Sequence, residues 1–179
     1  MQGSAKLWLP FDRIYEDGII KLKNNFYVKI LKVNPINFSL KSEFEKISIL
    51  NSYKLFLKTC NFDIQILIQS NKEDIERYTK FIKENQINES EKLKKISERY
   101  CEELNKINNE NIYSSKNFFI ILKKYEVEEN INLIKDELNN NYFKVKECLT
   151  RCGNNVIAIE NKNEVVNILY TFFNKNKNV

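Results

Sequence analysis

Residues 26–69 read FYVKILKVNPINFSLKSEFEKISILNSYKLFLKTCNFDIQILIQ, and this stretch decides the fold. It begins with an alternating run from Phe26 to Val33, which is typical of a strand that presents a different set of side chains to each face of a sheet. Pro35 ends that strand, because proline cannot continue the backbone ladder. Ser42-x-x-Glu45 is a capping box, in which each side chain accepts a hydrogen bond from the other residue's backbone N–H at the start of a helix. The stretch therefore predicts a strand–helix–strand unit.

The helix and the second strand of this unit each have an apolar pattern. Apolar residues three and four positions apart predict one buried stripe on the helix. The stripe comprises Phe44, Ile47, Leu50, Tyr53, Phe56 or Leu57, and Cys60. In the second strand Phe62, Ile64, Ile66 and Ile68 alternate with Asp63, Gln65 and Gln69. We expect the isoleucines of this strand to face the core.

Two turns precede the unit. Asp17-Gly18 and Asn24-Asn25 are turn signals, because Gly and Asn tolerate the left-handed backbone conformation. Residues 19–22 between them predict a short strand. Trp8, Pro10 and Phe11 form an apolar anchor that we expect to pack against the sheet edge.

The chain after the unit begins with a long helical segment. Ser70-x-x-Glu73 is a second capping box, and helical spacing continues to about Ile107. Residues 84–91 are almost wholly polar, and one helix of about 36 residues would be about 54 Å long. These features favour an antiparallel hairpin of two helices that turns near residues 85–90. One continuous helix is the alternative, since neither Pro nor Gly interrupts the segment.

A strand, a helix, a strand and a helix complete the chain. FFIILK at residues 118–123 predicts a strand that is apolar on both faces. Glu128 and Glu129 favour the start of a helix, and Gly153 suits its left-handed C-cap. The apolar stripe of that helix comprises Ile131, Ile134, Leu138, Tyr142, Val145, Leu149 and Cys152. Residues 155–159 predict the last strand, and Asn161 caps a closing helix at residues 165–173.

These elements predict an α+β fold with a mixed, mostly antiparallel sheet. The core is a split β-α-β-β-α-β arrangement of the ferredoxin-like kind. A long helical insertion at residues 71–110 lies between the third and fourth strands, and its hairpin form makes those two strands antiparallel. We expect a flexible lead at residues 1–6, a single domain at residues 7–174 and a frayed tail at residues 175–179.

Composition excludes several kinds of site. The 179 residues include no histidine, the commonest general base and metal ligand. The three glycines cannot form a phosphate-binding loop. The formal net charge is +5, from 29 basic and 24 acidic residues that are interleaved along the chain. No apolar run is long enough to span a bilayer, no signal peptide is evident, and the four cysteines lack a disulfide-framework spacing. We therefore expect a cytoplasmic protein.

The remaining chemical motifs have simpler structural interpretations. Cys148-x-x-x-Cys152 places two thiols one helical turn apart, but zinc needs four ligands, so core thiols are the preferred interpretation. Asp12, Glu16 and Asp17 are typical of a turn. We predict no catalytic residue, no cofactor-binding residue, no metal site and no bound cofactor, and we expect that the protein is not an enzyme.

Three sequence segments resemble a known family. WLPFDRIYEDGIIKLKNNFYVKILKVNPINFSLKS, followed by NSYKLFLKTCNFDIQILIQSNKEDIERY, is similar to the N-terminal TraC-like domain of type IV secretion (conjugation) ATPases. ELNNNYFKVKECLTRCGNNVIAIENKNEVVNILYTFFN resembles the end of that domain, and the similarity is closest to stand-alone forms from Gram-positive conjugative elements. In the full-length ATPases a RecA-like motor follows, whose phosphate-binding motifs are missing here. No ATPase residue is therefore carried over.

The resemblance implies a non-catalytic assembly module at the cytoplasmic face of a DNA-transfer channel, peripheral to the inner membrane. Its implied partners are a type IV secretion ATPase or inner-membrane channel proteins, and the helical segment is a candidate surface for self-association. The alternative is a nucleic-acid-binding domain that uses the sheet face or the basic residues of 72–108. The candidate interface residues are Trp8, Phe11, Arg77, Tyr78, Arg99 and Tyr100.

Overall fold

A computed structural model describes residues 8–72, 75–86, 90–109, 114–128 and 130–173. Side chains are described over residues 8–70, 78–86, 90–106, 116–128 and 130–173. The predicted lead at 1–6 and tail at 175–179 lie outside these ranges. In chain order the elements are β1 (Phe11–Ile14), β2 (Ile20–Leu22), β3 (Phe26–Asn34), η1 (Phe38–Leu40), α2 (Glu43–Thr59), β4 (Ile64–Lys72), α3 (Ile75–Asn85), α4 (Glu91–Asn109), β5 (Ser114–Tyr125), α5 (Ile131–Arg151), β6 (Asn155–Ala158) and α6 (Lys162–Phe173).

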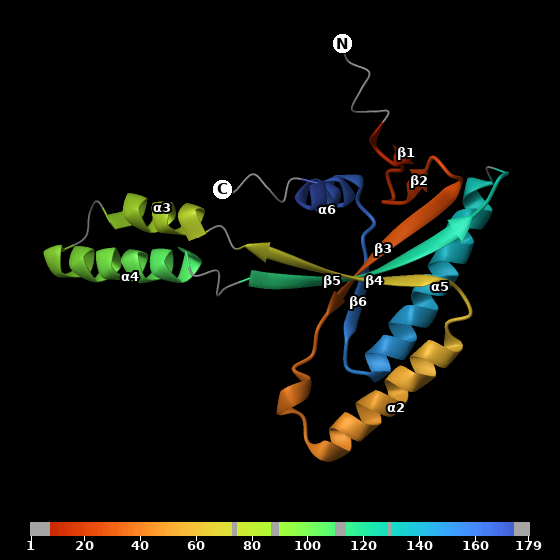
Figure 1. Ribbon diagram of the computed structural model, residues 1–179, viewed down its shortest axis with the longest axis horizontal. Coiled ribbons are helices and arrows are strands. Elements are labelled where there is room, and N and C mark those ends of the chain that lie inside the picture. The colour runs from red at the N-terminus through yellow and green to blue at the C-terminus, as the bar shows by residue number, and fades with distance from the viewer. Residues whose placement is uncertain (1–7, 73–74, 87–89, 110–113, 129, 174–179) are drawn as a thin grey trace, which may run out of the picture. The chain divides into compact units, whose positions relative to one another are not determined.

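The strands form one six-stranded sheet (Figure 1). Its order is β1-β2-β3-β5-β4, and β6 pairs with the second half of β3. The ladder between β3 and β5 is antiparallel and runs from the Phe26–Tyr125 pair to the Val33–Phe118 pair. β5 thus lies between β3 and β4, which confirms the predicted split β-α-β core and the α+β class.

The chain divides into two compact units. The first comprises residues 1–67 and 118–179, and the second comprises residues 68–117. The second unit contains α3 and α4, which pack on each other as two separate helices. The hairpin interpretation is therefore confirmed, and the single long helix is wrong.

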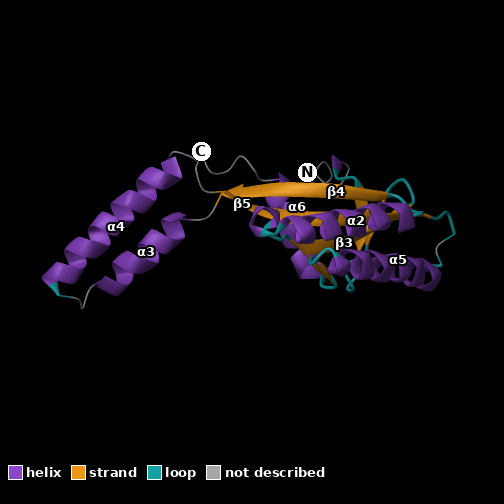
Figure 2. Cartoon of the chain, turned by 90° about the horizontal axis from the view of Figure 1, so that it is seen from below, coloured by secondary structure: helices purple, strands orange, loops and turns teal. Residues whose placement is uncertain are grey.

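In the first unit, helices cover both faces of the sheet. α2 and α5 pack together on one face (Figure 2), where Tyr27 and Leu31 of β3 join Leu138 and Val145 of α5 in a buried cluster. On the opposite face Val165 of α6 packs in a second cluster. Both faces of β5 are buried because alternate residues enter the two clusters, as the apolar run at 118–123 predicts.

Capping and turn residues predict several element ends correctly. Ser42 and Glu45 form the capping box of α2, and Asn25 and Gly18 adopt positive φ in the two turns. At the end of α5, Gly153 has φ +88°, and its N–H donates to the Thr150 carbonyl. The buried stripe of α5 is as predicted, with Ile134, Leu138, Tyr142, Val145, Leu149 and Cys152 all buried.

Several predictions about element ends are wrong. β4 continues to Lys72, so Ser70 lies in a strand and does not cap a helix; Glu73 lies outside the described residues. α5 begins at Ile131, because Asn130 supplies the cap by accepting from the Leu133 N–H. Phe11 opens an edge strand that the sequence pattern did not predict.

The predicted faces of α2 and β4 are only partly right: Phe56 of α2 and Ile64 of β4 pack in the first core cluster, but several other predicted residues do not. In α2 only Phe56 is fully buried, and most of the predicted stripe is exposed. In β4 the side chains of Ile66 and Ile68 are exposed, whereas Leu67 packs in the second core cluster and Gln69 is buried. Pattern alone could not choose the buried face here, because both elements carry apolar residues on more than one side.

Candidate functional site

The α3–α4 hairpin exposes a row of large apolar side chains. Phe81 is 62% exposed and Ile96 is 64% exposed, and Tyr78, Leu93 and Tyr100 are about half exposed. Two helices enclose little volume, and among their described side chains only Thr79 and Cys101 are buried. A pair of amphipathic helices that leaves this much apolar surface in water is typical of a protein-binding element.

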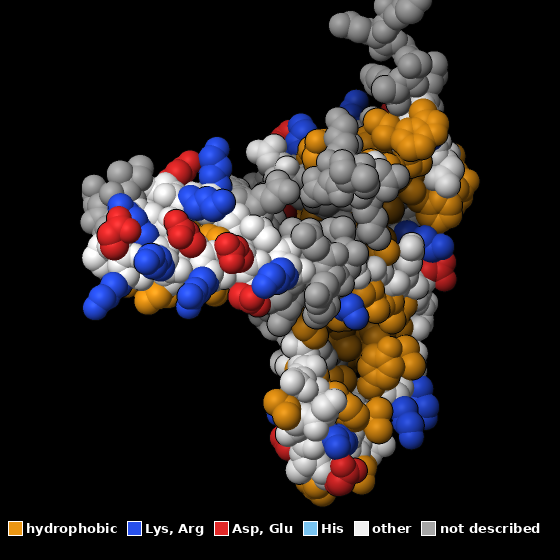
Figure 3. Space-filling model, turned by 60° about the vertical axis from the view of Figure 1, so that its left-hand side comes forward, with side chains coloured by type: hydrophobic (Ala, Val, Ile, Leu, Met, Phe, Trp, Pro, Cys, Tyr) orange, Lys and Arg blue, Asp and Glu red, His pale blue; other side chains and the backbone are white. Residues whose placement is uncertain are grey.

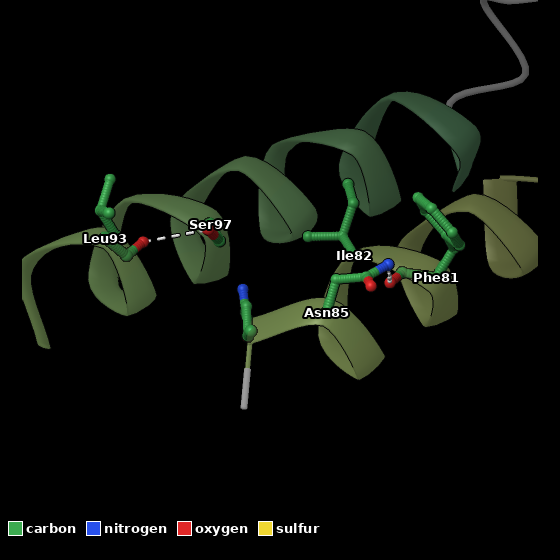
Figure 4. Close-up of a pocket in the computed structure, with 6 residues that line it drawn as sticks. Phe81, Ile82, Asn85, Leu93 and Ser97 are labelled. Carbon is green, nitrogen blue, oxygen red and sulfur yellow. Dashed lines mark hydrogen bonds between the residues drawn. The ribbon is translucent and has the colours of Figure 1, made fainter. Parts of the chain in front are cut away.

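One end of the hairpin is hollow (Figure 4). A cavity of about 260 Å³ has walls from both helices, made by Phe81, Ile82, Asn85, Gln86, Leu93 and Ser97. Asn85 Nδ2 donates to the Phe81 carbonyl at 2.9 Å, and Ser97 Oγ donates to the Leu93 carbonyl at 3.0 Å. These two groups are therefore satisfied within their own helices, whereas Gln86 Nε2 is buried in the same wall and has no hydrogen-bond partner among the described residues.

Tyr78 and Tyr100 lie together, one from each helix. Their hydroxyl groups share a hydrogen bond, and this bond raises the pKa of Tyr100. The bond links the two helices and presents two aromatic rings at the same place. Such amphipathic rings are common in protein interfaces.

Charged side chains of both signs alternate along the hairpin, as Figure 3 shows. Lys80 lies 3.9 Å from Glu84, and Lys106 lies 3.0 Å from Glu103. Because acids accompany the bases, the described side chains of α3 and α4 do not form a uniformly basic surface for phosphates. This arrangement does not favour the nucleic-acid alternative.

The predicted interface residues fall into two groups. Tyr78, Tyr100 and Arg99 share the hairpin, and the Arg99 side chain is exposed. The side chain of Arg77 lies outside the described ones. Trp8 and Phe11 belong to the first unit.

Trp8 does not pack under the sheet edge as predicted. It is 74% exposed, and its ring contacts the Phe173 ring at the end of α6, with 5.9 Å between centroids. Phe11, by contrast, packs in the second core cluster. β1 starts at Phe11, so Trp8 lies outside the strand.

The sequence pattern missed a second apolar surface, on α2. Its exposed residues are Phe44, Ile47, Leu50, Leu55 and Leu57. Beneath α2, toward the sheet, lies a hollow of about 270 Å³ whose walls include Tyr53, Ile66 and Phe118. The signal was present in the sequence, since α2 has apolar residues on more than one side, whereas a helix that is covered on one face only has a single apolar stripe.

Three of the four cysteines belong to the core of the first unit, and Cys101 is buried in the second unit. Cys60, Cys148 and Cys152 lie in the first core cluster, and burial raises the pKa of the Cys60 and Cys152 thiols. Thiols with raised pKa values are poor nucleophiles near neutral pH. No group of His, Cys, Asp or Glu suited to a metal ion occurs among the described residues.

Comparison with protein families identifies the chain. The model of the archaeal TraC-like domain matches residues 12–174. No curated protein and no solved structure gives a significant match. None of the described helices combines the length and the hydrophobicity that a membrane crossing requires. The match covers both compact units and all the predicted interface residues except Trp8 and Phe11. The chain therefore belongs to the archaeal TraC-like domain family.

Proposed function

We propose that this chain is a non-catalytic interaction module of a conjugative (type IV secretion) DNA-transfer machine. The observation that carries the proposal is the row of exposed apolar side chains on the α3–α4 hairpin. Membership of the TraC-like family supports the context of a transfer machine. The module docks a motor ATPase or a channel component at the cytoplasmic face of the membrane, where it is peripheral.

The hairpin is suited to bind protein for a physical reason. Phe81 and Ile96 expose apolar surface to water, and a groove on a partner would bury it. Each large apolar side chain that becomes fully buried contributes about 1.5–3 kcal/mol to the free energy of binding. The tyrosine pair adds aromatic surface beside them. The alternating charges around this row suit the polar rim of a protein interface.

Affinity capture from the native host tests the proposal. Tagged wild type is compared with Phe81→Ser/Ile96→Ser, which removes the apolar row, and with Leu133→Ser, which removes an exposed leucine of α5 as a matched control. Each capture is run at low and at high salt, with and without nuclease, and bound proteins are identified by mass spectrometry. Circular dichroism checks that the variants fold.

We expect wild type and Leu133→Ser to retain a secretion ATPase or a membrane channel subunit after nuclease treatment, and Phe81→Ser/Ile96→Ser to lose it. Protein interfaces of mixed character change little with salt, whereas phosphate contacts weaken steeply. Recovery of nucleic acid alone, lost at high salt, would reject the proposal in favour of the nucleic-acid alternative.

A further inference from the structure

Helix α2 has two apolar sides, and the first unit covers only one of them. Ile49, Phe56 and Cys60 face the core. On the other side Ile47 is 59% exposed, and Leu50 and Leu57 are each 50% exposed. Exposed leucines and isoleucines on one helix face mark a surface that a second element covers.

The exposed side has a regular spacing. Glu43, Ile47, Leu50, Lys54 and Leu57 follow one another at intervals of four, three, four and three residues. This is the spacing of the residues that form the seam between two helices in a coiled coil. We call these five residues the α2 seam.

The charges of the α2 seam are arranged so that it complements itself. Glu43 lies near its beginning and Lys54 near its end, with Ile47 and Leu50 between them. If two copies of α2 pack in opposite directions, Ile47 of each copy lies opposite Leu50 of the other. In the same register Glu43 lies opposite Lys54. Packing in the same direction would instead place Glu43 beside Glu43 and Lys54 beside Lys54.

Both charges are exposed at the surface of the helix. Lys54 is exposed and makes no ion pair with any residue that the structure describes. Glu43 is 85% exposed, and its ion pair with Lys46 at 2.7 Å lies on the helix surface. An antiparallel pair also sets the positive end of one helix dipole beside the negative end of the other.

We propose that α2 pairs in an antiparallel manner with α2 of a second copy of this chain, through the α2 seam. The arrangement has two-fold symmetry, so each copy supplies the same surface. It goes beyond the proposed function, because it uses a surface of the first unit and not the α3–α4 hairpin.

The size of the seam sets the strength of the pairing. A helix of 17 residues is about 25 Å long, so one helix pair buries less than the ~800 Å² per partner of a standard interface. The dimer is therefore reversible, and we expect it to form at concentrations of roughly 10–1,000 µM.

Sedimentation equilibrium over that concentration range tests the proposal. Wild type should change from monomer to dimer as its concentration rises. Leu50→Glu places a charge at the centre of the seam and should remain a monomer throughout. Leu133→Glu changes an exposed leucine of α5 in the same way and should dimerise like wild type.

Charge exchange tests the antiparallel direction. Glu43→Lys and Lys54→Glu should each reduce self-association at least tenfold, because each places like charges opposite one another at both ends of the seam. A mixture of the two variants should form a heterodimer, and the double variant Glu43→Lys/Lys54→Glu should dimerise again. Circular dichroism verifies helix content in each variant.

Three results would overturn the inference. The first is a wild-type chain that stays monomeric up to about 1,000 µM, the upper end of the range in which we expect the dimer. The second is dimerisation of Leu50→Glu equal to that of wild type, which would place the contact elsewhere. The third is equal dimerisation of wild type and both single charge variants, which would exclude the antiparallel register. None of these results bears on whether the hairpin binds a partner.

Discussion

At the scale of single residues, Gly18 and Gly153 have the same backbone conformation in different surroundings. Both have positive φ, +80° and +88°. A Cβ at Gly18 would collide with the Ile159 carbonyl oxygen, whereas a Cβ at Gly153 meets only Ile36 Cγ2 at 3.6 Å, an ordinary contact. A substitution at Gly153 therefore introduces backbone strain alone, whereas a substitution at Gly18 adds a steric clash.

We expect Gly153→Ala to lower the free energy of unfolding by about 1 kcal/mol, the cost of a left-handed alanine. Gly18→Ala should cost at least about 2 kcal/mol more, because the backbone of two segments must move apart. Urea denaturation of both variants measures the difference. Equal losses would show that the Ile159 segment shifts without cost.

Lys29 is a buried cation on β3, only 3% exposed. Its Nζ donates to Asn139 Oδ1 at 2.8 Å and lies 3.4 Å from Glu160 Oε1, and the Tyr142 ring is 5.8 Å away. Because the ammonium is satisfied mainly by Asn139, removing that amide leaves part of a buried charge without a partner.

Asn139→Ala should therefore lower the free energy of unfolding by about 1–3 kcal/mol. Lys29→Met keeps the aliphatic volume without the charge and should cost about 1 kcal/mol or less. Asn140→Ala, at the exposed neighbouring position, is the control and should have almost no effect. Thermal unfolding followed by circular dichroism gives all three values, and a Lys29→Met loss larger than that of Asn139→Ala would contradict this account.

At the scale of elements, the capping box of α2 gives a pH dependence. The hydrogen bond from the Ser42 backbone N–H lowers the pKa of Glu45 from 4.5 to about 2, with the Ser42 hydroxyl and Lys41 acting in the same direction. A carboxyl whose pKa is lower in the folded state stabilises that state above the unfolded pKa. This contribution is lost as the pH falls from about 4.5 to about 2.

Glu45→Gln removes this titration. We expect wild type to have the higher melting temperature at pH 6, and the difference between the two to narrow steadily below pH 4.5. Thermal melts at half-unit pH steps between 2 and 6 measure it. A difference that stays constant over that range would show that Glu45 does not titrate with the helix.

The sequence predicted elements better than faces. The starts of α2 and α6 and the end of α5 follow from Ser42, Asn161 and Gly153, because capping depends on a few neighbouring residues. The buried side of α2 could not be fully predicted, since Ile47 and Leu50 fit a core stripe as well as Ile49 does. Tertiary packing determines which of these two sides of α2 is buried. The contact between Tyr78 and Tyr100 also depends on how the helices pack, although the hairpin itself was evident from the polar run at 84–91.

At the scale of the whole molecule, the two units differ in the amount of hydrophobic core that each contains. Both hydrophobic clusters contain only residues of the first unit. The second unit enters and leaves through β4 and β5, which are neighbours in the sheet. Among the described residues, the packed core therefore lies in the first unit.

We expect the first unit to survive excision of the hairpin. Joining Ser70 to Lys116 through an Asn-Gly turn, which suits adjacent antiparallel strands, should leave a protein that unfolds cooperatively and loses less than about 2 kcal/mol. Calorimetry measures the transition. A shortened chain without a cooperative transition would show that residues 71–115 stabilise the first unit directly.

The position of β5 between β3 and β4 also determines when the fold can close during synthesis. Phe26 pairs with Tyr125, 99 residues later in the chain. At a synthesis rate of ~5–20 residues per second, β3 waits roughly 5–20 s for its central neighbour. In that interval the nascent chain carries two strands without the partner that separates them, while the helical hairpin, whose contacts are local, can already form. A truncated chain that ends before Tyr125 would therefore lack part or all of the strand that β3 and β4 share. Its unpaired strand edges would be exposed, and chaperones would bind them.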